Sequence, residues 1–534
     1  MKREHLLSMI KELVAIPSVT ESERESEPGA WLRARLEKLP YFAENPAHLI
    51  TADTPLEGSP HSLKSLVARV DAAKPTKRTV LMVSHYDVVD VSVYGDIAAH
   101  AFDTDKLGEI FGADEDTLYG RGVMDMKCGV ALEAALLEEF AADRTLFDVN
   151  VVVAFVGDEE NSSAGMRGAL PVIARMIEDD GLEFLAALNT EPGEAGKSGL
   201  VGPMVYLGTL GKLMPSFYMR GRGAHVGNCY DGFSAALAVS RLVCAAEGNR
   251  YLADPLHGVC EPSWICLDMK VLRETYSVTV PDRAYAYFNC FTTGNTPEKV
   301  MNQMKGLASR ALFETSAQLA ESCEALTEMG YDGSRFAASE PAVYTLGELE
   351  ALARARRGEK FDAELADFIK KLPPGDMRMR GIRVVDFIAD CSGAEGPYAV
   401  CFFLPPWMPA RTDFTSDPRD AKIVEAARAV EKLCREKYGL EMTEVELFAG
   451  LCDLSYAGAK ISGGDVKALS ENTPGWGGLY GLPLSEMRAL GLPVMNLGPS
   501  GEAPHKKDER LHLRYSLDVL PELLYAAIRE IAKR

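Results

Sequence analysis

The sequence lacks the features that would place a protein in a membrane or outside the cell. No run of apolar residues reaches the length of about 18 needed to cross a bilayer. The first 18 residues form an amphipathic helix pattern, broken by Lys11 and Glu12, rather than a secretion signal. The 11 cysteines are scattered and include no CxxC pair, which favours free thiols in a reducing compartment. We therefore expect a cytoplasmic protein without disulfides or a cysteine-based zinc site.

An excess of positive charge is also missing. Lys and Arg number 57 and Asp and Glu number 78, which gives a formal net charge of −21. A chain this acidic offers no basic face to neutralise phosphates, so neither nucleic acid nor an anionic membrane is an expected partner. No GxSxG motif is present, which argues against a serine hydrolase. With 47% hydrophobic and 25% charged residues, the composition is that of a globular protein.

The order of apolar runs predicts an α/β fold. Two runs, TVLMVS (79–84) and VNVVVAFV (149–156), are almost entirely apolar, as are strands buried on both faces of a parallel or mixed sheet. One helix pattern, 127–140, lies between these runs and another, 164–178, follows them. Strands that alternate with helices of this length indicate βαβ units.

An insertion interrupts this pattern. From about residue 209 the order becomes strand, helix, two strands and a long helix, which predicts an α+β domain with helices on one face of an open sheet. The next stretch is charged and mostly helical, and either domain could include it. The α/β pattern resumes with the apolar run GPYAVCFFLPPWMP. The predicted segments are a main α/β domain over 1–208 and 375–534, the inserted domain over 209–330, and the helical insertion over 331–374.

Candidate functional residues follow the ends of the predicted strands, where open α/β sheets gather their ligand sites. His85 leaves the first apolar strand in SHYDVVD, and Asp87 follows two residues later on the same side of an extended segment. Asp87 can therefore hydrogen-bond to the far nitrogen of His85, an arrangement that orients metal-bound histidines. A surface histidine near a turn is the alternative.

Acidic residues occupy comparable positions further along the chain. Asp125, in LYGRGVMDMKCG, stands where a helix cap belongs, and capping is its alternative role. Asp158, Glu159 and Glu160 directly follow the second apolar strand, and such clustered carboxylates repel unless cations, raised pKa values or solvent exposure relieve them. Glu191 follows a short strand in LNTEP, where it could equally be a solvated loop acid.

The last candidate lies near the C-terminus. The strand PVMNLGP leads into SGEAPHKKDER, which contains His505 and, four residues later, Glu509. Each of these patterns is weak alone, but together they place two imidazoles and several carboxylates at the ends of successive strands. Such a set could bind two zinc-like ions bridged by one carboxylate.

The motifs SHYDVVD, GRGVMDMKCG, DEEN with SAGM, EP and APHKKDE, in this order, resemble those of the dinuclear zinc aminoacylase, carboxypeptidase and desuccinylase superfamily, peptidase clan MH. The phrases NTEP, GTLGKLMPSFYMRG, DLSYAG and GPSGEAPHKKDERLH are most similar to a subgroup associated with arginine utilisation. The resemblance covers most of the chain. It implies a phosphorylase/hydrolase-like mixed-sheet catalytic domain and, over about 209–330, a ferredoxin-like lid that also forms a homodimer.

The resemblance also implies a cofactor of two divalent metal ions, zinc first, with cobalt and manganese as alternatives. The ligands of one ion would be His85, Asp125 and Glu191. The ligands of the other would be Glu160, His505 and again Asp125, which would bridge the two ions and be followed by a cis peptide bond.

Three further residues receive roles by the same resemblance. Glu159 would be the general base, and Asp87 would be the hydrogen-bond partner of the first histidine ligand. His225, in GRGAHVG, would reach the active site of the partner subunit and stabilise an oxyanion; a loop histidine beside glycines is its alternative.

The sequence departs from the superfamily pattern in the inserted domain. Many members carry an arginine at the end of a lid strand to bind the substrate carboxylate, whereas VPDRAYAYFNCF offers Asn289 and Phe291 there. Asp453, in CDLSYAG, takes the place of the aspartate in a glycine-threonine-aspartate signature. A free α-carboxylate on the substrate is therefore not implied.

The expected function is hydrolysis of an amide bond in a small N-acyl amino acid or short peptide, in arginine or amino-acid catabolism. Two metal ions and the general base Glu159 would activate the attacking water. The alternative is a non-catalytic metal-binding or ligand-binding protein on the same scaffold. Every predicted ligand and the predicted base are present, which favours the enzyme.

Overall fold

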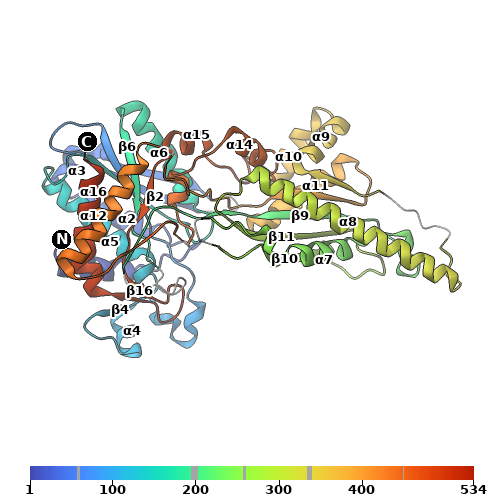
Figure 1. The fold of residues 1–534 in the computed structure, drawn as a ribbon, viewed down its shortest axis with the longest axis horizontal. Helices are drawn as coiled ribbons and strands as arrows, with labels where there is room; N and C mark the ends of the chain where they lie inside the picture. Colours follow the sequence, from blue (N-terminus) through green and yellow to red (C-terminus); the bar gives the residue numbers. More distant parts are fainter. Residues whose placement is uncertain are drawn as a thin grey trace. The chain divides into compact units, whose positions relative to one another are not determined.

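The computed structural model describes residues 1–56, 61–193, 203–256, 260–333, 340–415, 417–448 and 450–533. The chain divides into two compact units (Figure 1). Unit 1 comprises Met1–Leu210, Pro409–Lys460 and Pro483–Arg534, and unit 2 comprises Gly211–Met408 and Ile461–Leu482. No helix in the described part of the chain is long and apolar enough to cross a membrane. All 11 cysteines are free, as the sequence predicts.

An eight-stranded mixed sheet forms the centre of unit 1, in the order β1-β2-β5-β3-β6-β15-β7-β14. The predicted apolar strands β3 and β5 lie inside it and are buried from residue 79 to 85 and from residue 150 to 156. Strands β5, β3, β6 and β15 are parallel to their neighbours in this series. The strands are β1 (Leu49–Pro55), β2 (Ser62–Val70), β3 (Arg78–His85), β5 (Asn150–Val156), β6 (Glu183–Asn189), β7 (Met204–Tyr206), β14 (Thr443–Val445) and β15 (Val494–Asn496).

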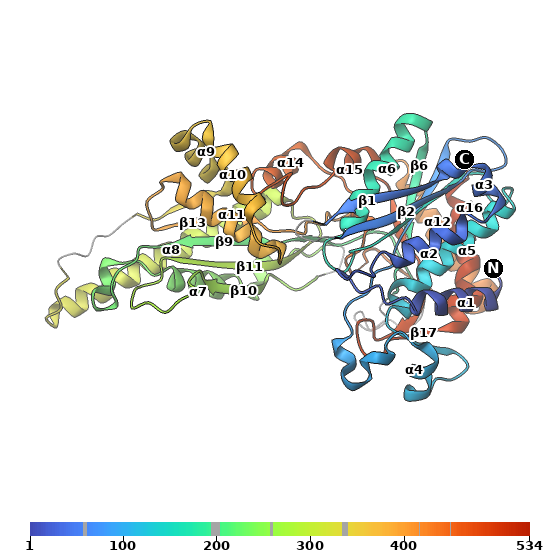
Figure 2. The same cartoon turned by 180° about the vertical axis from the view of Figure 1, so that it is seen from behind.

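Helices cover both faces of this sheet. One face packs in a single apolar core against α1 (Arg3–Val14), α2 (Glu27–Leu36), α5 (Cys128–Ala142), α12 (Asp420–Tyr438) and α16 (Leu520–Ile531). Figures 1 and 2 both show α12 beside α16. The other face carries α6 (Ala164–Asp180), whose close approach to Ser65 and Thr54 requires Gly165 and Gly168.

The remaining elements of unit 1 lie outside the large sheet. Strands β4, β17 and β16 form a small antiparallel sheet in the order β16-β17-β4. These elements are α3 (Pro40–Glu44), α4 (Thr104–Phe111), β4 (Thr117–Tyr119), α13 (Leu454–Ala457), α15 (Leu484–Leu490), β16 (Gly501–Glu502) and β17 (Arg510–His512).

Unit 2 is built on a six-stranded sheet, in the order β10-β11-β9-β13-β12, with β8 paired to β11. Helices α7 and α8 pack against one face, and α9, α10 and α11 form an apolar core on the other. The strands are β8 (Gly211–Leu213), β9 (Pro215–Arg220), β10 (Ile265–Val271), β11 (Arg283–Thr292), β12 (Ala342–Thr345) and β13 (Tyr398–Phe403). The helices are α7 (Ala235–Ala246), α8 (Pro297–Glu328), α9 (Leu346–Arg357), α10 (Lys360–Lys371), α11 (Met377–Ser392) and α14 (Gly463–Ser470).

The structure divides the chain differently from the predicted segments. The helical insertion 331–374 belongs to unit 2, where it covers the second face of a sheet expected to have helices on one face only. The predicted return to the main domain at residue 375 is also displaced, because β13 pairs with β9 and β12 in unit 2. An apolar run that is buried on both faces fits either sheet equally well. Sequence periodicity therefore could not assign it.

Candidate metal centre

The parallel strands of unit 1 bring the predicted site residues to one edge of the sheet. The carboxyl ends of β5, β3, β6 and β15 meet at this edge. His85 ends β3, Glu191 follows β6, and the three consecutive acids follow β5. The segment after β15 carries His505. Residues as far apart in the chain as Asp125 and His505 therefore become neighbours.

Two groups of possible metal ligands form there, and they share one carboxylate. In the first group, His85 Nε2 lies 3.2 Å from Asp125 Oδ1 and 3.3 Å from Glu191 Oε1. In the second, His505 Nε2 lies 3.1 Å from Asp125 Oδ2 and 3.1 Å from Glu160 Oε1. Within each group the donor atoms all lie within 4.8 Å of one another. Asp125 thus presents one oxygen to each histidine, and the peptide bond after it is cis, as expected.

Asp87 links the first histidine to the acidic loop. This buried carboxylate has its Oδ1 atom 3.4 Å from Nδ1 of His85, and it accepts hydrogen bonds from the hydroxyl of Thr20 at 2.9 Å and the backbone N–H groups of Glu159 and Glu160 at 3.2 and 3.3 Å. The Asp87 carboxylate thus lies within ion-pair distance of His85, while the hydrogen bond at Nδ1 goes to the backbone carbonyl oxygen of Asp87 at 3.1 Å. The contacts with Thr20 and with the loop were not apparent from sequence, because they depend on the packing of separate segments.

The electrostatics of the two groups fit divalent cations. Burial raises the pKa of Glu191 to about 7, with the carboxylates of Asp125 and Glu160 adding to the effect and His85 opposing it. Hydrogen bonds to Asp125 and Glu160 raise the pKa of His505 to about 11. The pKa values of Glu191 and Glu160 are thus raised, whereas hydrogen bonds from His505 and His85 lower that of Asp125. Imidazole nitrogens and carboxylate oxygens are also the donor types that zinc accepts, so the residues present fit two such ions.

Glu159 belongs to neither ligand group among the described residues. Burial raises the pKa of its carboxyl well above the ordinary value, and the carboxylates of Glu191 and Asp453 add to this effect. Asp453 is itself buried, and burial raises its pKa to about 7. The structure thus places Asp453, which the sequence singled out, among the charges that surround the predicted base.

His225 is the one predicted site residue outside unit 1. It lies in unit 2, in an exposed loop between β9 and α7, and its Nδ1 accepts the backbone N–H of Gly227 at 3.1 Å. A neutral imidazole that accepts at Nδ1 carries its proton on Nε2. In this form Nε2 of His225 is therefore a hydrogen-bond donor.

A buried glutamate that the sequence did not single out supports the end of β6. The hydroxyl of Thr190 donates to Glu133 Oε1 at 2.9 Å, directly before Glu191. Burial raises the pKa of Glu133 to about 8. The sequence could have shown this, because Glu133 lies in the apolar, alanine-rich segment CGVALEAALL of α5. An acid in an otherwise apolar helix needs a hydrogen-bond partner.

Gly498 makes room for Glu191, and alanine there is expected to destabilise the protein. A Cβ atom on Gly498 would lie 1.8 Å from the carbonyl oxygen of Glu191. We expect Gly498→Ala to lower the free energy of unfolding by about 1–3 kcal/mol, because the backbone must shift to admit the methyl group. Urea unfolding measures this. Gly306→Ala, in the interior of α8 with no atom within 4 Å of the new Cβ, is the control and should not destabilise. Equal stability of Gly498→Ala and wild type would contradict the close approach.

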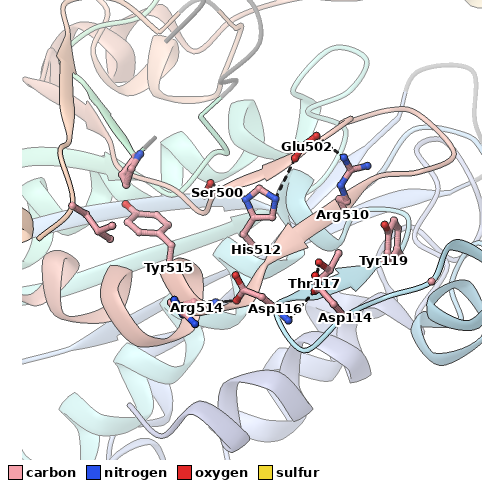
Figure 3. Close-up of a pocket in the computed structure, with 13 residues that line it drawn as sticks. Asp114, Asp116, Thr117, Tyr119, Ser500, Glu502, Arg510, His512, Arg514 and Tyr515 are labelled. Atoms are coloured by element: carbon pink, nitrogen blue, oxygen red, sulfur yellow. Dashed lines mark hydrogen bonds and ion pairs between the residues drawn. The ribbon is translucent and has the colours of Figure 1, made fainter. Parts of the chain in front are cut away.

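A separate cavity of about 650 Å³ lies beside the small sheet of unit 1 (Figure 3). Its labelled lining residues come from β4, β16, β17, the π-helix Arg514–Val519 and adjoining loops, with His512 between Ser500 and Glu502 (Figure 3). None of the predicted ligands lines it. The cavity is therefore distinct from the candidate metal centre.

Comparisons with known proteins agree with this geometry. The model of peptidase family M20/M25/M40 matches residues 81–530. The uncharacterized protein YqjN of Bacillus subtilis (strain 168) is 30% identical over 100% of this chain and 97% of its own, and protein RocB of the same strain is 26% identical over 98% and 94%. The fold is similar to that of an M20 family metallo-carboxypeptidase, Sso-CP2 from Sulfolobus solfataricus, with a TM-score of 0.54 at 14% identity, over 99% of this chain and 100% of that one.

Proposed function

This chain belongs to peptidase family M20/M25/M40, and on that premise we propose that it hydrolyses an amide bond in a small N-acyl amino acid or short peptide. The observation that carries the proposal is the pair of ligand groups, His85–Asp125–Glu191 and Asp125–Glu160–His505, which share Asp125. The adjacent Glu159 belongs to neither group. A carboxylate shared by the two groups and a nearby glutamate outside both fit hydrolysis at a two-metal centre.

The chain's own residues would act around the substrate in a defined order. Two divalent ions, when bound, supply charge that polarises the scissile carbonyl and favours ionisation of water. Glu159 takes a proton from the attacking water and then delivers it to the nitrogen of the leaving amine. Asp87 orients His85 and, through two backbone N–H groups, the loop that carries Glu159. The products are a carboxylic acid and an amine.

His225 would donate a hydrogen bond to the developing oxyanion in the partner subunit's active site. The contact between its Nδ1 and the N–H of Gly227 supports this role, because it leaves the Nε2 proton free to be donated. The role requires a homodimer. The exposed edge strand β10 of unit 2 supports such a dimer, since Leu267 and Met269 are 51% and 42% exposed there.

Disruption of β10 is expected to separate the subunits. A Leu267→Asp/Met269→Asp variant places two charges on the exposed strand, so we expect its mass in light scattering to fall from dimer to monomer at micromolar concentration. Hydrolysis should fall with it, because His225 of the partner subunit is lost. Val93→Asp, at an exposed apolar position of unit 1, is the control and should remain dimeric. A monomeric wild-type protein would remove the role assigned to His225.

The proposed function is tested with metal-free and metal-loaded protein. Chelated protein, then protein reloaded with zinc, cobalt or manganese, is assayed against a panel of N-acyl amino acids and dipeptides by detection of the released amine. Because the sequence resembles a subgroup associated with arginine utilisation, N-acyl-arginines are the first compounds of the panel to be tested. Metal-dependent release supports the proposal. Loaded protein that binds panel compounds without cleaving any of them would favour the alternative, a non-catalytic binding protein.

A further inference from the structure

A buried ion pair joins two of the three chain segments that supply the second group of ligands, those of Asp125 and His505. Arg121 lies two residues after the end of β4, and Glu509 directly precedes β17, the strand with which β4 pairs. Arg121 Nη1 lies 2.8 Å from Glu509 Oε2, and each side chain is 1% exposed. The N–H of Gly120 also donates to the carbonyl oxygen of Glu509 at 3.3 Å. The pair therefore continues the β4–β17 ladder into the interior.

Each side chain of the pair also forms hydrogen bonds with the backbone of a segment that carries one of the predicted ligands. Oε1 of Glu509 accepts the backbone N–H groups of Met124 at 3.1 Å and Asp125 at 3.3 Å. Nη2 of Arg121 donates to the carbonyl oxygen of His505 at 3.2 Å. The two side chains thus form a continuous connection from the backbone of Asp125 to that of His505.

The backbone conformation of His505 is one that this connection can stabilise. Its φ is +63°, in the left-handed region that residues other than glycine seldom adopt, so surrounding contacts must hold it there. The His505 side chain is about half exposed, which leaves it little packing of its own. The hydrogen bond from Arg121 to the His505 carbonyl is a contact that can hold the backbone in this conformation.

We propose that Arg121 and Glu509 are positioning residues that fix Asp125 and His505 relative to each other, and thereby set the affinity of the second group for its metal ion. The inference rests on the proposed function, because it needs the two groups to be metal ligands. Neither residue is a ligand itself. The sequence showed the signs, an arginine between two glycines in GRG and an acid four residues after His505, but not that the two side chains meet.

The test separates positioning from stability. A buried ion pair contributes little net stability compared with an apolar pair of similar volume, so Arg121→Met/Glu509→Leu should fold. We expect this double variant to bind the ion of the second group about 10–100 times more weakly, as changes behind metal ligands typically do. The ion of the first group should be affected less, because His85 and Glu191 keep their contacts. Calorimetric titration of metal-free protein with Zn²⁺ measures both affinities, and circular dichroism checks the fold.

The matched control is a second buried arginine–carboxylate pair of unit 1, between Arg411 and Asp420. Its apolar replacement, Arg411→Met/Asp420→Val, should leave Zn²⁺ affinity unchanged. Glu509→Gln serves as a second variant if the apolar pair does not fold. It keeps an oxygen for the two N–H groups but turns an amide NH2 towards the Arg121 guanidinium, so the second ion should again bind more weakly.

The outcomes distinguish this inference from the proposed function. Wild-type protein that binds no Zn²⁺ would end the proposed metal centre. Wild-type protein that binds two ions, together with a folded Arg121→Met/Glu509→Leu or Glu509→Gln variant that binds them equally well, would overturn only the positioning role. Weaker binding of the second ion in the variants, with none in the control, supports it.

Discussion

Substitution of Glu159 by glutamine is expected to lower kcat by about 10²–10⁴-fold, the usual contribution of a general base, and to leave both metal ions bound. Glutamine has nearly the same size, but it cannot take a proton from water. The carboxyl group that it replaces belongs to neither ligand group, so metal content should not change. The measurements are steady-state kinetics on the best substrate of the panel and metal analysis of the same preparation.

Glu25→Gln is the matched control for this substitution. Glu25 is also a buried glutamate of unit 1, and burial together with the carboxylates of Asp87 and Asp158 raises its pKa to about 9. It belongs to neither ligand group, so we expect activity close to that of the wild type. Full activity in Glu159→Gln would remove Glu159 as the base even if the metal centre were intact.

Asp125→Ala is expected to have the largest effect on metal content, because one side chain serves both ligand groups. Its two oxygens lie 3.2 Å from His85 Nε2 and 3.1 Å from His505 Nε2. Loss of both oxygens should reduce the bound metal from two ions per chain towards none and abolish hydrolysis. His85→Ala and His505→Ala should each weaken one ion predominantly. Metal analysis after dialysis against a fixed concentration of free Zn²⁺ measures the three stoichiometries.

The control for Asp125 lies in the same loop as His505. Asp508 pairs with Arg510 at 3.4 Å and belongs to neither ligand group, so Asp508→Ala should retain two ions. Two ions in a folded Asp125→Ala variant would show that the shared carboxylate is not needed. Loss of both ions in His85→Ala alone would instead show that the groups do not bind independently.

The buried strands of the fold were predictable because neighbouring residues along the chain determine them. The central run of β3, Val80–Val83, and all of β5 after Asn150 are apolar, the composition of a strand buried on both faces. Residues 276–291 have the composition of one continuous strand, yet β11 covers only Arg283–Thr292 and Tyr276 is 91% exposed. The residue types of an exposed apolar segment do not differ from those of a buried one. The sequence alone therefore could not show where the strand begins.

The candidate ligands were predictable for a different reason, whereas their division into two groups came from the resemblance to the superfamily. Each candidate follows a strand end, and parallel strands bring such ends together. Contacts between side chains that no local pattern links were not predictable. Arg121 and Glu509 are 388 residues apart, and Thr20 reaches Asp87 across 67 residues. Such pairs depend on the final packing, and neither residue of a pair carries a sequence pattern that identifies the other.

The division of each unit into separate chain segments has a consequence for synthesis. Unit 2 is completed by residues 461–482, whose Asn472 accepts the N–H of Phe403 at 2.8 Å and whose Tyr480 accepts that of Trp407 at 3.2 Å. Unit 1 is completed still later, by the segment that carries His505. A nascent chain that ends at residue 460 therefore lacks part of both units. Because domains generally fold as whole units, neither should reach its final structure until translation is nearly finished, and truncated chains should be readily degraded.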